Sequence, residues 1–286
     1  MKQIDYNFRG TRGSIPPQLF KYIDMSDMAG ETKKFTDYIN AIAYDFILKE
    51  QALHPDGKLT DAIKDITLNA PKLFGHDVTL EYIGHGTYAS VYKMNVGEVV
   101  FALKINFVTK VVSDIRAIEE HKRARNLINR PYIGATFVCG GLDYSWVLSD
   151  YVERDYENSF VDAKEKLFYA TITKGVRYSD MHPLNVKNGR IIDLGGIEHM
   201  EPRLPRVEID MVKKFMDLMR KDDEVSVRAL ADKALARHPN VINYLYIKMA
   251  MHQMEMPMCL QKFKKIIGEY NTRRLRVMRD AAAAER

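Results

Sequence analysis

The chain has 286 residues, of which 46% are hydrophobic and 28% are charged, and its net charge is +5. This composition is typical of a soluble globular protein, with ample apolar material for one two-lobed domain or two small ones, and it excludes no function class by charge alone. The mild positive charge suits an anionic ligand or nucleic acid, and equally an ordinary solvated surface.

The cysteines and the hydropathy pattern bear on the compartment. Cys139 and Cys259 lie far apart in the sequence, so they form neither a metal-binding spacing nor a disulfide framework. No apolar run is long enough to span a bilayer, and the N-terminus lacks the apolar core of a signal peptide. We therefore expect a cytoplasmic protein with no membrane partner.

The first 75 residues are predicted to form a helical N-terminal extension. Residues 1–30 are polar, with Gly10, Gly13 and a Pro-Pro pair, and are interpreted as irregular. Apolar residues then recur at helical spacing from Phe35 to Ile47, and this helix should end before the turn signal at residues 54–57. Thr60 can cap a shorter helix that carries Ala62, Ile63 and Ile66.

The next part of the chain, residues 76–152, reads as a sheet with one inserted helix. Five short runs are rich in β-branched and aromatic residues, and a hairpin turn is expected over residues 95–98. Residues 113–128 have a helical apolar pattern. The five runs are VTLEYIGHG (78–86), SVYKMN (90–95), EVVFALKINF (98–107), YIGATFVCGG (132–141) and YSWVLSDYV (144–152).

Residues 153–286 are predicted to be mostly helical, with one hairpin around Asn188-Gly189. The candidate helices cover residues 161–174, 206–220, 225–237, 239–254 and 258–280. Strands followed by helices, without regular alternation, predict an α+β fold with an N-terminal antiparallel sheet and a C-terminal helical part.

A glycine-rich segment, Gly84-His85-Gly86-Thr87-Tyr88-Ala89-Ser90-Val91, joins two predicted strands. Glycines let the backbone approach a phosphate closely and expose its N–H groups. A dinucleotide-binding fingerprint would need a helix next, whereas this segment leads into a strand. That order favours a kinase-type Gly-rich hairpin. An ordinary glycine hairpin is the alternative.

Lys104 interrupts the apolar strand Val99–Ile105. A buried lysine there needs a partner, unless the strand lies at an edge with Lys104 in solvent. The functional interpretation is a lysine held over nucleotide phosphates and paired to a glutamate of the following helix. Glu119 and Glu120 are the candidates, and Glu120 is preferred because it shares a helical face with apolar residues.

The segment from Val176 to Gly196 contains two aspartates and an asparagine at short spacing. Five positions separate Asp180 from Asn185, and Asp193 lies eight positions further on. The oxygens of Asn185 and Asp193 suit Mg²⁺, which takes few protein ligands and completes its shell with phosphates and water. Asp180 would then accept a proton from a hydroxyl. The alternative is a surface hairpin with solvated aspartates.

This ordered set resembles the protein kinase-like superfamily, over roughly residues 78–220. Five segments carry the resemblance. They are Gly84-x-Gly86-x-x-Ala89-x-Val91 for the Gly-rich loop, Ala102-Leu103-Lys104 for the strand lysine, Leu148–Val152 for the hinge, Tyr178–Asn185 for the catalytic loop and Asp193-Leu194-Gly195 for the metal-binding triplet.

The resemblance implies a bilobal fold and transfer of the ATP γ-phosphoryl group to Ser or Thr in other proteins. ATP would contact Gly84, Gly86, Tyr88, Val91, Lys104 and Glu120, with its adenine ring near Asp150 and Val152. Mg²⁺ would bind Asn185 and Asp193, and Asp180 would be the catalytic base. The implied partners are protein substrates, with nucleic acid as a weaker candidate.

The sequence also departs from the family pattern. His182 replaces the usual lysine of the catalytic loop, which implies that it contacts the transferred phosphoryl group. No Ala-Pro-Glu motif follows Gly195, so a regulatory activation segment is not expected. This form is similar to minimal kinases of phages, among them the early protein kinases of podophages, and of bacterial effectors. It implies activity without loop phosphorylation, in the cytoplasm of a host cell.

Two alternatives belong to other functional classes. The pattern Asp-x-His-Pro-x-Asn, followed closely by Asp-Leu-Gly, also resembles small-molecule kinases of the aminoglycoside phosphotransferase-like group. A non-catalytic nucleotide-binding or scaffold protein is the other alternative, although such a protein has no need of Asp180.

Overall fold

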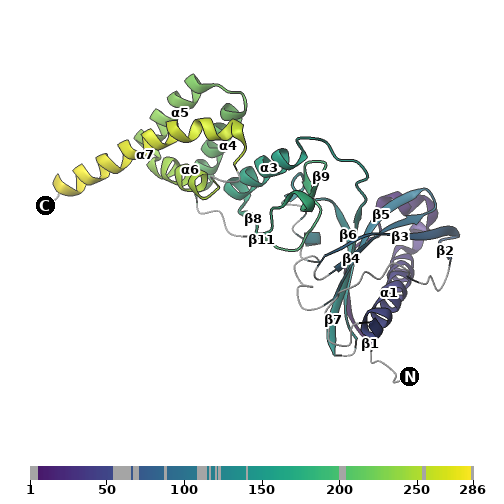
Figure 1. Cartoon of the computed structure of the whole chain (residues 1–286). Coiled ribbons are helices and arrows are strands. Elements are labelled where there is room, and N and C mark those ends of the chain that lie inside the picture. Colours follow the sequence, from purple (N-terminus) through teal and green to yellow (C-terminus); the bar gives the residue numbers. More distant parts are fainter. Residues whose placement is uncertain are drawn as a thin grey trace. The chain divides into compact units, whose positions relative to one another are not determined.

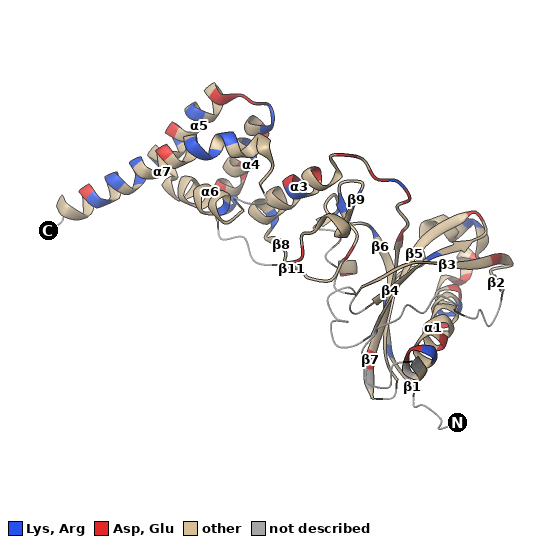
Figure 2. Ribbon diagram, in the orientation of Figure 1, with Lys and Arg blue, Asp and Glu red and all other residues tan. Residues whose placement is uncertain are grey.

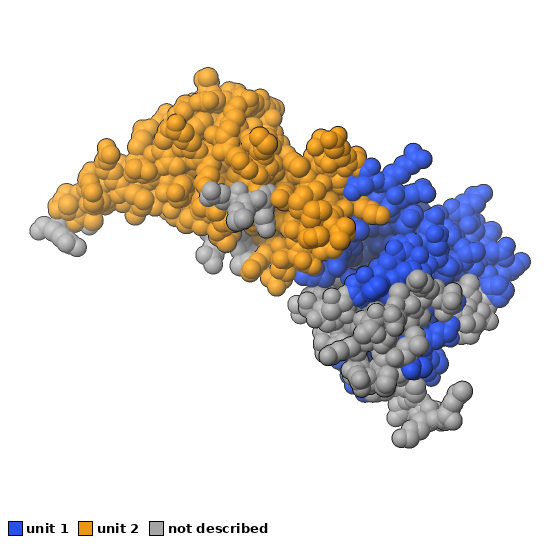
Figure 3. Space-filling model, in the orientation of Figure 1, with its two compact units in different colours: residues 1–155, 192–197 blue, residues 156–191, 198–286 orange. Residues whose placement is uncertain are grey.

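The computed structural model describes residues 6–53, 66, 71–86, 89–107, 115, 117–119, 121, 124–139, 141–199, 204–252 and 256–284. The fold is mixed α/β, with an antiparallel sheet in the N-terminal part and helices in the C-terminal part (Figure 1), as the order of predicted elements indicated. The chain divides into two compact units. Unit 1 contains residues 1–155 and 192–197, and unit 2 contains residues 156–191 and 198–286 (Figure 3).

Unit 1 is built on a seven-stranded sheet in the order β1-β6-β7-β5-β4-β3-β2. Every paired neighbour in it is antiparallel. The five strands expected from the sequence form its centre, and the predicted hairpin turn joins β4 to β5. The strands are β1 (Tyr6–Gly13), β2 (Lys72–Leu73), β3 (His76–Gly86), β4 (Ala89–Val96), β5 (Val99–Phe107), β6 (Pro131–Cys139) and β7 (Leu142–Asp150).

The interpretation of residues 1–30 as irregular was wrong over the described residues 6–30. β1 pairs with β6 along its whole length, and two 3₁₀ helices follow, η1 (Pro17–Tyr22) and η2 (Met25–Asp27). Gly13 fits this pairing because its φ is +89° and an added Cβ would lie 2.1 Å from the carbonyl oxygen of Tyr132. β1 therefore owes its conformation to a partner more than 100 residues away, and its own apolar pattern is weak.

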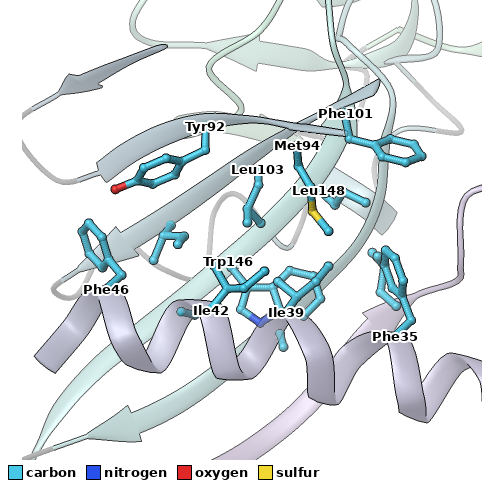
Figure 4. Packing of buried hydrophobic residues seen from close by; sticks show 14 of the residues in the cluster. Phe35, Ile39, Ile42, Phe46, Tyr92, Met94, Phe101, Leu103, Trp146 and Leu148 are labelled. Atoms are coloured by element: carbon cyan, nitrogen blue, oxygen red, sulfur yellow. The ribbon is translucent and has the colours of Figure 1, made fainter. Parts of the chain in front are cut away.

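Helix α1 (Met28–Leu53) covers one face of the sheet, and it ends before His54 as predicted. Phe35, Ile39, Ile42 and Phe46 recur at helical spacing and are buried against the strands (Figure 4). The strands contribute buried side chains at alternate positions to the same core, including Tyr92, Met94, Phe101, Leu103, Trp146 and Leu148. Trp146 Nε1 also donates a hydrogen bond of 2.7 Å to Asn40 Oδ1 of α1.

The inserted helix is shorter than predicted. Residues 115, 117–119, 121 and 124 are helical, whereas residues 125–127 form a turn. The helix expected after Thr60 lies outside the described residues.

Unit 2 contains five α-helices among its described residues: α3 (Ser159–Lys174), α4 (Arg206–Arg220), α5 (Glu224–Arg237), α6 (Pro239–Met251) and α7 (Met258–Ala284). They match the five predicted helices, except that α6 ends earlier and α7 runs further. Their apolar faces share one core that includes Phe168, Phe215, Leu245 and Phe263. Short elements follow α3, namely β8 (Val176–Tyr178), η3 (Pro183–Asn185), β9 (Val186–Lys187), β10 (Arg190–Ile191) and β11 (Ile197–His199). None of the described helices combines the length and apolarity needed to cross a membrane.

Candidate functional site

Lys104 lies on the face of the sheet opposite α1. Successive side chains of a strand point to opposite faces, and Leu103 packs in the core beneath α1. Directly paired residues share a face, and Lys104 pairs with Val91 on β4 and with Val147 on β7. Exposure alternates accordingly, because Phe101, Leu103 and Ile105 are buried, whereas Ala102 and Lys104 are half-buried. The strand is thus central in the sheet, not an edge.

Lys104 forms an ion pair with Asp193, 89 positions later in the chain. Lys104 Nζ lies 2.6 Å from Asp193 Oδ1, and the two side chains are 20% and 38% exposed. The same Oδ1 accepts a hydrogen bond of 3.1 Å from the backbone N–H of Gly195. Oδ2 of Asp193 has no partner among the described residues, so this oxygen can bind a cation.

Gly84 and Gly86 end β3 on the Gly-rich segment. Gly84 pairs with Val91, and the register shifts between Tyr82 and Gly84. An added Cβ at either glycine would meet no atom within 4 Å, and neither has a positive φ. The fold therefore does not require glycine at these two positions, unlike at Gly13. Packing within the protein does not explain the two glycines, whereas a ligand that approaches the backbone closely would explain them.

The end of β7 is held by several hydrogen bonds. The backbone N–H of Asp150 donates to the carbonyl oxygen of Arg130 at 3.0 Å, and its own carbonyl oxygen accepts from Asn129 Nδ2 at 2.6 Å. The Asp150 carboxylate accepts from the hydroxyl of Tyr132. Val152 follows in the segment after β7, where the ring centroid of Tyr151 lies 5.1 Å from Lys93 Nζ in a cation–π contact. The backbone N–H and C=O of Asp150 are thus both hydrogen-bonded within unit 1, which the sequence did not predict.

Asp180 and Asn185 meet in unit 2. Asn185 Nδ2 donates to both the carbonyl oxygen and the Oδ2 atom of Asp180, each at 3.0 Å. Since both neighbours are acceptors, the amide nitrogen must face Asp180 and the amide oxygen must face away. Asn185 Oδ1 therefore faces away from Asp180, while Asp180 is exposed and keeps its own Oδ1 without a partner among the described residues.

His182 caps the 3₁₀ turn η3 that carries Asn185. Its Nδ1 accepts a hydrogen bond of 3.2 Å from the backbone N–H of Leu184. With Nδ1 as the acceptor, the proton of the neutral imidazole lies on Nε2. His182 is exposed, so Nε2 is a donor that can reach an anionic group.

The hairpin after Asn185 is fixed to α3. Asn188 and Gly189 have φ angles of +51° and +64°, as a two-residue Asn-Gly turn requires. The N–H of Gly189 donates to the buried hydroxyl of Ser159 at 2.9 Å, and Lys166 Nζ donates to the Gly189 carbonyl oxygen at 2.9 Å. The turn predicted here is confirmed, and these bonds hold the loop of Asp180 and Asn185 in unit 2.

Other predicted residues are not brought to this site, or lie outside the description. Glu119 is exposed and pairs with Arg12 of β1, so it is not seen beside Lys104. Glu120, the preferred partner of Lys104, and Tyr88 lie outside the described residues. A groove of about 730 Å³ between α1 and β1 contains none of the predicted site residues.

The predicted site residues are divided between the two units. Unit 1 carries Lys104 and Asp193, and unit 2 carries Asp180 and Asn185. In the described part of the chain, no three His, Cys, Asp or Glu side chains are grouped to hold a metal. Mg²⁺ is compatible with so few protein ligands, because it is usually bound by one or two side chains together with phosphates and water. The chain matches no family model and no curated protein.

Proposed function

We propose that the chain is an ATP- and Mg²⁺-dependent protein kinase with a bilobal, kinase-like fold, in which unit 1 binds the nucleotide. The observation that carries the proposal is the 2.6 Å ion pair between Lys104 and Asp193. Sequence reasoning assigned these residues separately to phosphate binding and to metal binding. Their contact on one face of the sheet supports a single site that handles both.

The sheet face of Lys104 is suited to a nucleotide. Val91 and Ala102 are half-buried on this face and would contact the adenine ring, while Gly84 and Gly86 let the β3–β4 hairpin cover the phosphates. Lys104 would bind the α- and β-phosphates. Asp193 Oδ2 and Asn185 Oδ1 would hold Mg²⁺, which when bound neutralises charge on the phosphates.

The loop of unit 2 supplies the acceptor side of the reaction. Asp180 would orient the attacking hydroxyl and take its proton, and its bond from Asn185 fixes the carboxylate for this role. Nε2 of His182 would donate to the transferred phosphoryl group.

We propose a protein as the acceptor, in the cytoplasm of a host cell, because of the charge of α7. This helix carries seven Lys or Arg and two Asp or Glu, and they line its length (Figure 2). Several of the cations are exposed, which suits an extended anionic partner surface. Acidic protein substrates fit this charge, and nucleic acid is the second partner it would suit.

The experiment uses the full chain with radiolabelled ATP, Mg²⁺ and a cell lysate. Asp180→Asn and Asp193→Asn are compared with wild type and with a matched control, Asp232→Asn, whose carboxylate is exposed and lies 3.5 Å from Arg273. Wild type and the control should label proteins, and Asp180→Asn should reduce labelling about 100-fold or more. Asp193→Asn should remove the dependence of ATP binding on Mg²⁺.

Three results would argue against this proposal. Equal labelling by wild type and Asp180→Asn would exclude Asp180 as the base. Label recovered in small molecules and not in protein would favour a small-molecule phosphotransferase. If wild type neither transfers phosphate nor binds ATP, the kinase hypothesis is wrong.

A further inference from the structure

A polar cluster connects the N-terminal segment to the end of β7. Gln18, in η1, donates through Nε2 to the hydroxyl of Tyr132 at 2.5 Å and to Asp150 Oδ1 at 3.4 Å. The Tyr132 hydroxyl donates in turn to the Asp150 carboxylate. None of these three residues neighbours another in sequence, so the cluster exists only because β1 and η1 fold against the sheet.

The chemistry of Tyr132 keeps the cluster in one arrangement. Its side chain is only 5% exposed, and burial together with the Asp150 carboxylate raises the pKa of its phenol to about 12. The phenol therefore stays protonated and donates to Asp150, while Gln18 donates to the phenol oxygen. The backbone N–H of Ser14 also donates to the Tyr132 carbonyl oxygen at 3.0 Å. The N-terminal segment thus holds Tyr132 from both its main chain and its side chain.

Asp150 is the last residue of β7, and its backbone is bonded on both sides, to Arg130 and to Asn129. Fixing its side chain as well determines how the chain leaves the sheet over residues 151 and 152. Resting on the proposed function, this is the backbone beside which the adenine ring would bind. We propose that Gln18 is a positioning residue for the nucleotide: through Tyr132 and Asp150, the N-terminal segment sets the backbone that binds adenine.

Gln18 is exposed and contributes little to the core, so its substitution can change nucleotide positioning without a large change in the stability of the fold. The experiment measures binding of Mg²⁺-ATP and of Mg²⁺-tripolyphosphate to the full chain by calorimetry. Tripolyphosphate has the phosphates but no base, so it reports on the Lys104 side of the site alone. The variant is Gln18→Leu, and the matched control is Gln261→Leu, which removes an amide that donates to Met256 in unit 2.

Gln18→Leu should raise the Kd for Mg²⁺-ATP about 3- to 10-fold and leave the Kd for tripolyphosphate unchanged, whereas Gln261→Leu should change neither. In the transfer assay, the KM for ATP should rise by a similar factor with kcat unchanged. Gln18→Glu should weaken ATP binding further, because it sets one carboxylate against another. Adding Asp150→Asn to Gln18→Glu should restore most of that loss.

The inference is overturned if wild type binds ATP and Gln18→Leu binds it equally well, and the proposed function then stands. It is also overturned if Gln18→Leu weakens both ligands alike, since that indicates general destabilisation. If wild type binds tripolyphosphate but not ATP, no base site exists for Gln18 to position. If wild type binds neither ligand, the proposed function fails first and this inference fails with it.

Discussion

Replacing Asn40 by leucine tests how α1 is attached to the sheet. Asn40 Oδ1 is the acceptor for the indole N–H of Trp146, whose side chain is fully buried. Asn40→Leu leaves that N–H without its acceptor, and a buried unsatisfied donor costs about 1–3 kcal/mol. Asn40 is only half-buried and lines the groove beside β1, so water can partly replace the lost bond. We therefore expect a loss of about 1–2 kcal/mol, or about 3–6 °C in Tm.

The assay is urea unfolding followed by fluorescence, because Trp146 is the only tryptophan of the chain. The midpoint should fall while the slope stays constant. Asn95→Leu is the matched control, since Asn95 donates 2.7 Å to Thr79 at an exposed position of the same sheet. It should change stability by less than about 0.5 kcal/mol. If Asn40→Leu costs no more than this control, the bond to Trp146 does not help to hold α1 on the sheet.

Three further predictions follow from the site. Lys104→Met should lower the rate of phosphate transfer about 100-fold or more. The Tm should change little, because the ion pair between Lys104 and Asp193 is partly exposed. A large fall in Tm, measured by circular dichroism, would contradict this prediction. Gly84→Ala should weaken ATP binding without loss of stability, because an added Cβ meets no atom within 4 Å. Gly189→Ala should instead destabilise the protein by more than about 1 kcal/mol, because the φ of Gly189 is +64° and the new Cβ would lie 2.3 Å from Tyr156 Oη. Equal Tm values for the two variants would refute this distinction. The raised phenol pKa of Tyr132 means that folding favours the neutral phenol, so its contribution is complete below pH 10 and is lost as pH rises toward 12. The stability difference between wild type and Tyr132→Phe, measured by urea unfolding, should therefore shrink between pH 10 and pH 12.

The sequence predicted the elements whose apolar pattern is strong and local. The stripe from Phe35 to Ile47 identified α1, and β-branched runs identified β3 to β7. β1 was missed because it is a polar edge strand whose own apolar pattern is weak, and it forms by pairing with β6. The early end of the inserted helix was missed for a related reason, since helical periodicity continues through residues 125–127 although the backbone turns there.

The site was predictable as a set of residue types but not as a set of contacts. Motif order named Lys104, Asp180, Asn185 and Asp193, and the local bond between Asn185 and Asp180 agrees with their five-residue spacing. The contact between Lys104 and Asp193 was not predicted, because it depends on how distant segments fold together. The same holds for Gln18, since a glutamine in a polar segment gives no signal until Tyr132 is placed beside it.

The division of the chain has a consequence for any attempt to dissect the protein. The backbone passes between the two units three times, after residues 155, 191 and 197. A gene fragment that stops at residue 155 would encode the whole sheet and α1, yet it would lack Asp193, a carboxylate that pairs with Lys104. Cleavage at that one linker by a protease would release residues 1–155 from residues 156–286, and Asp193 would stay with the second fragment. The units are thus compact, but neither one is a single continuous segment that could be expressed or replaced by itself.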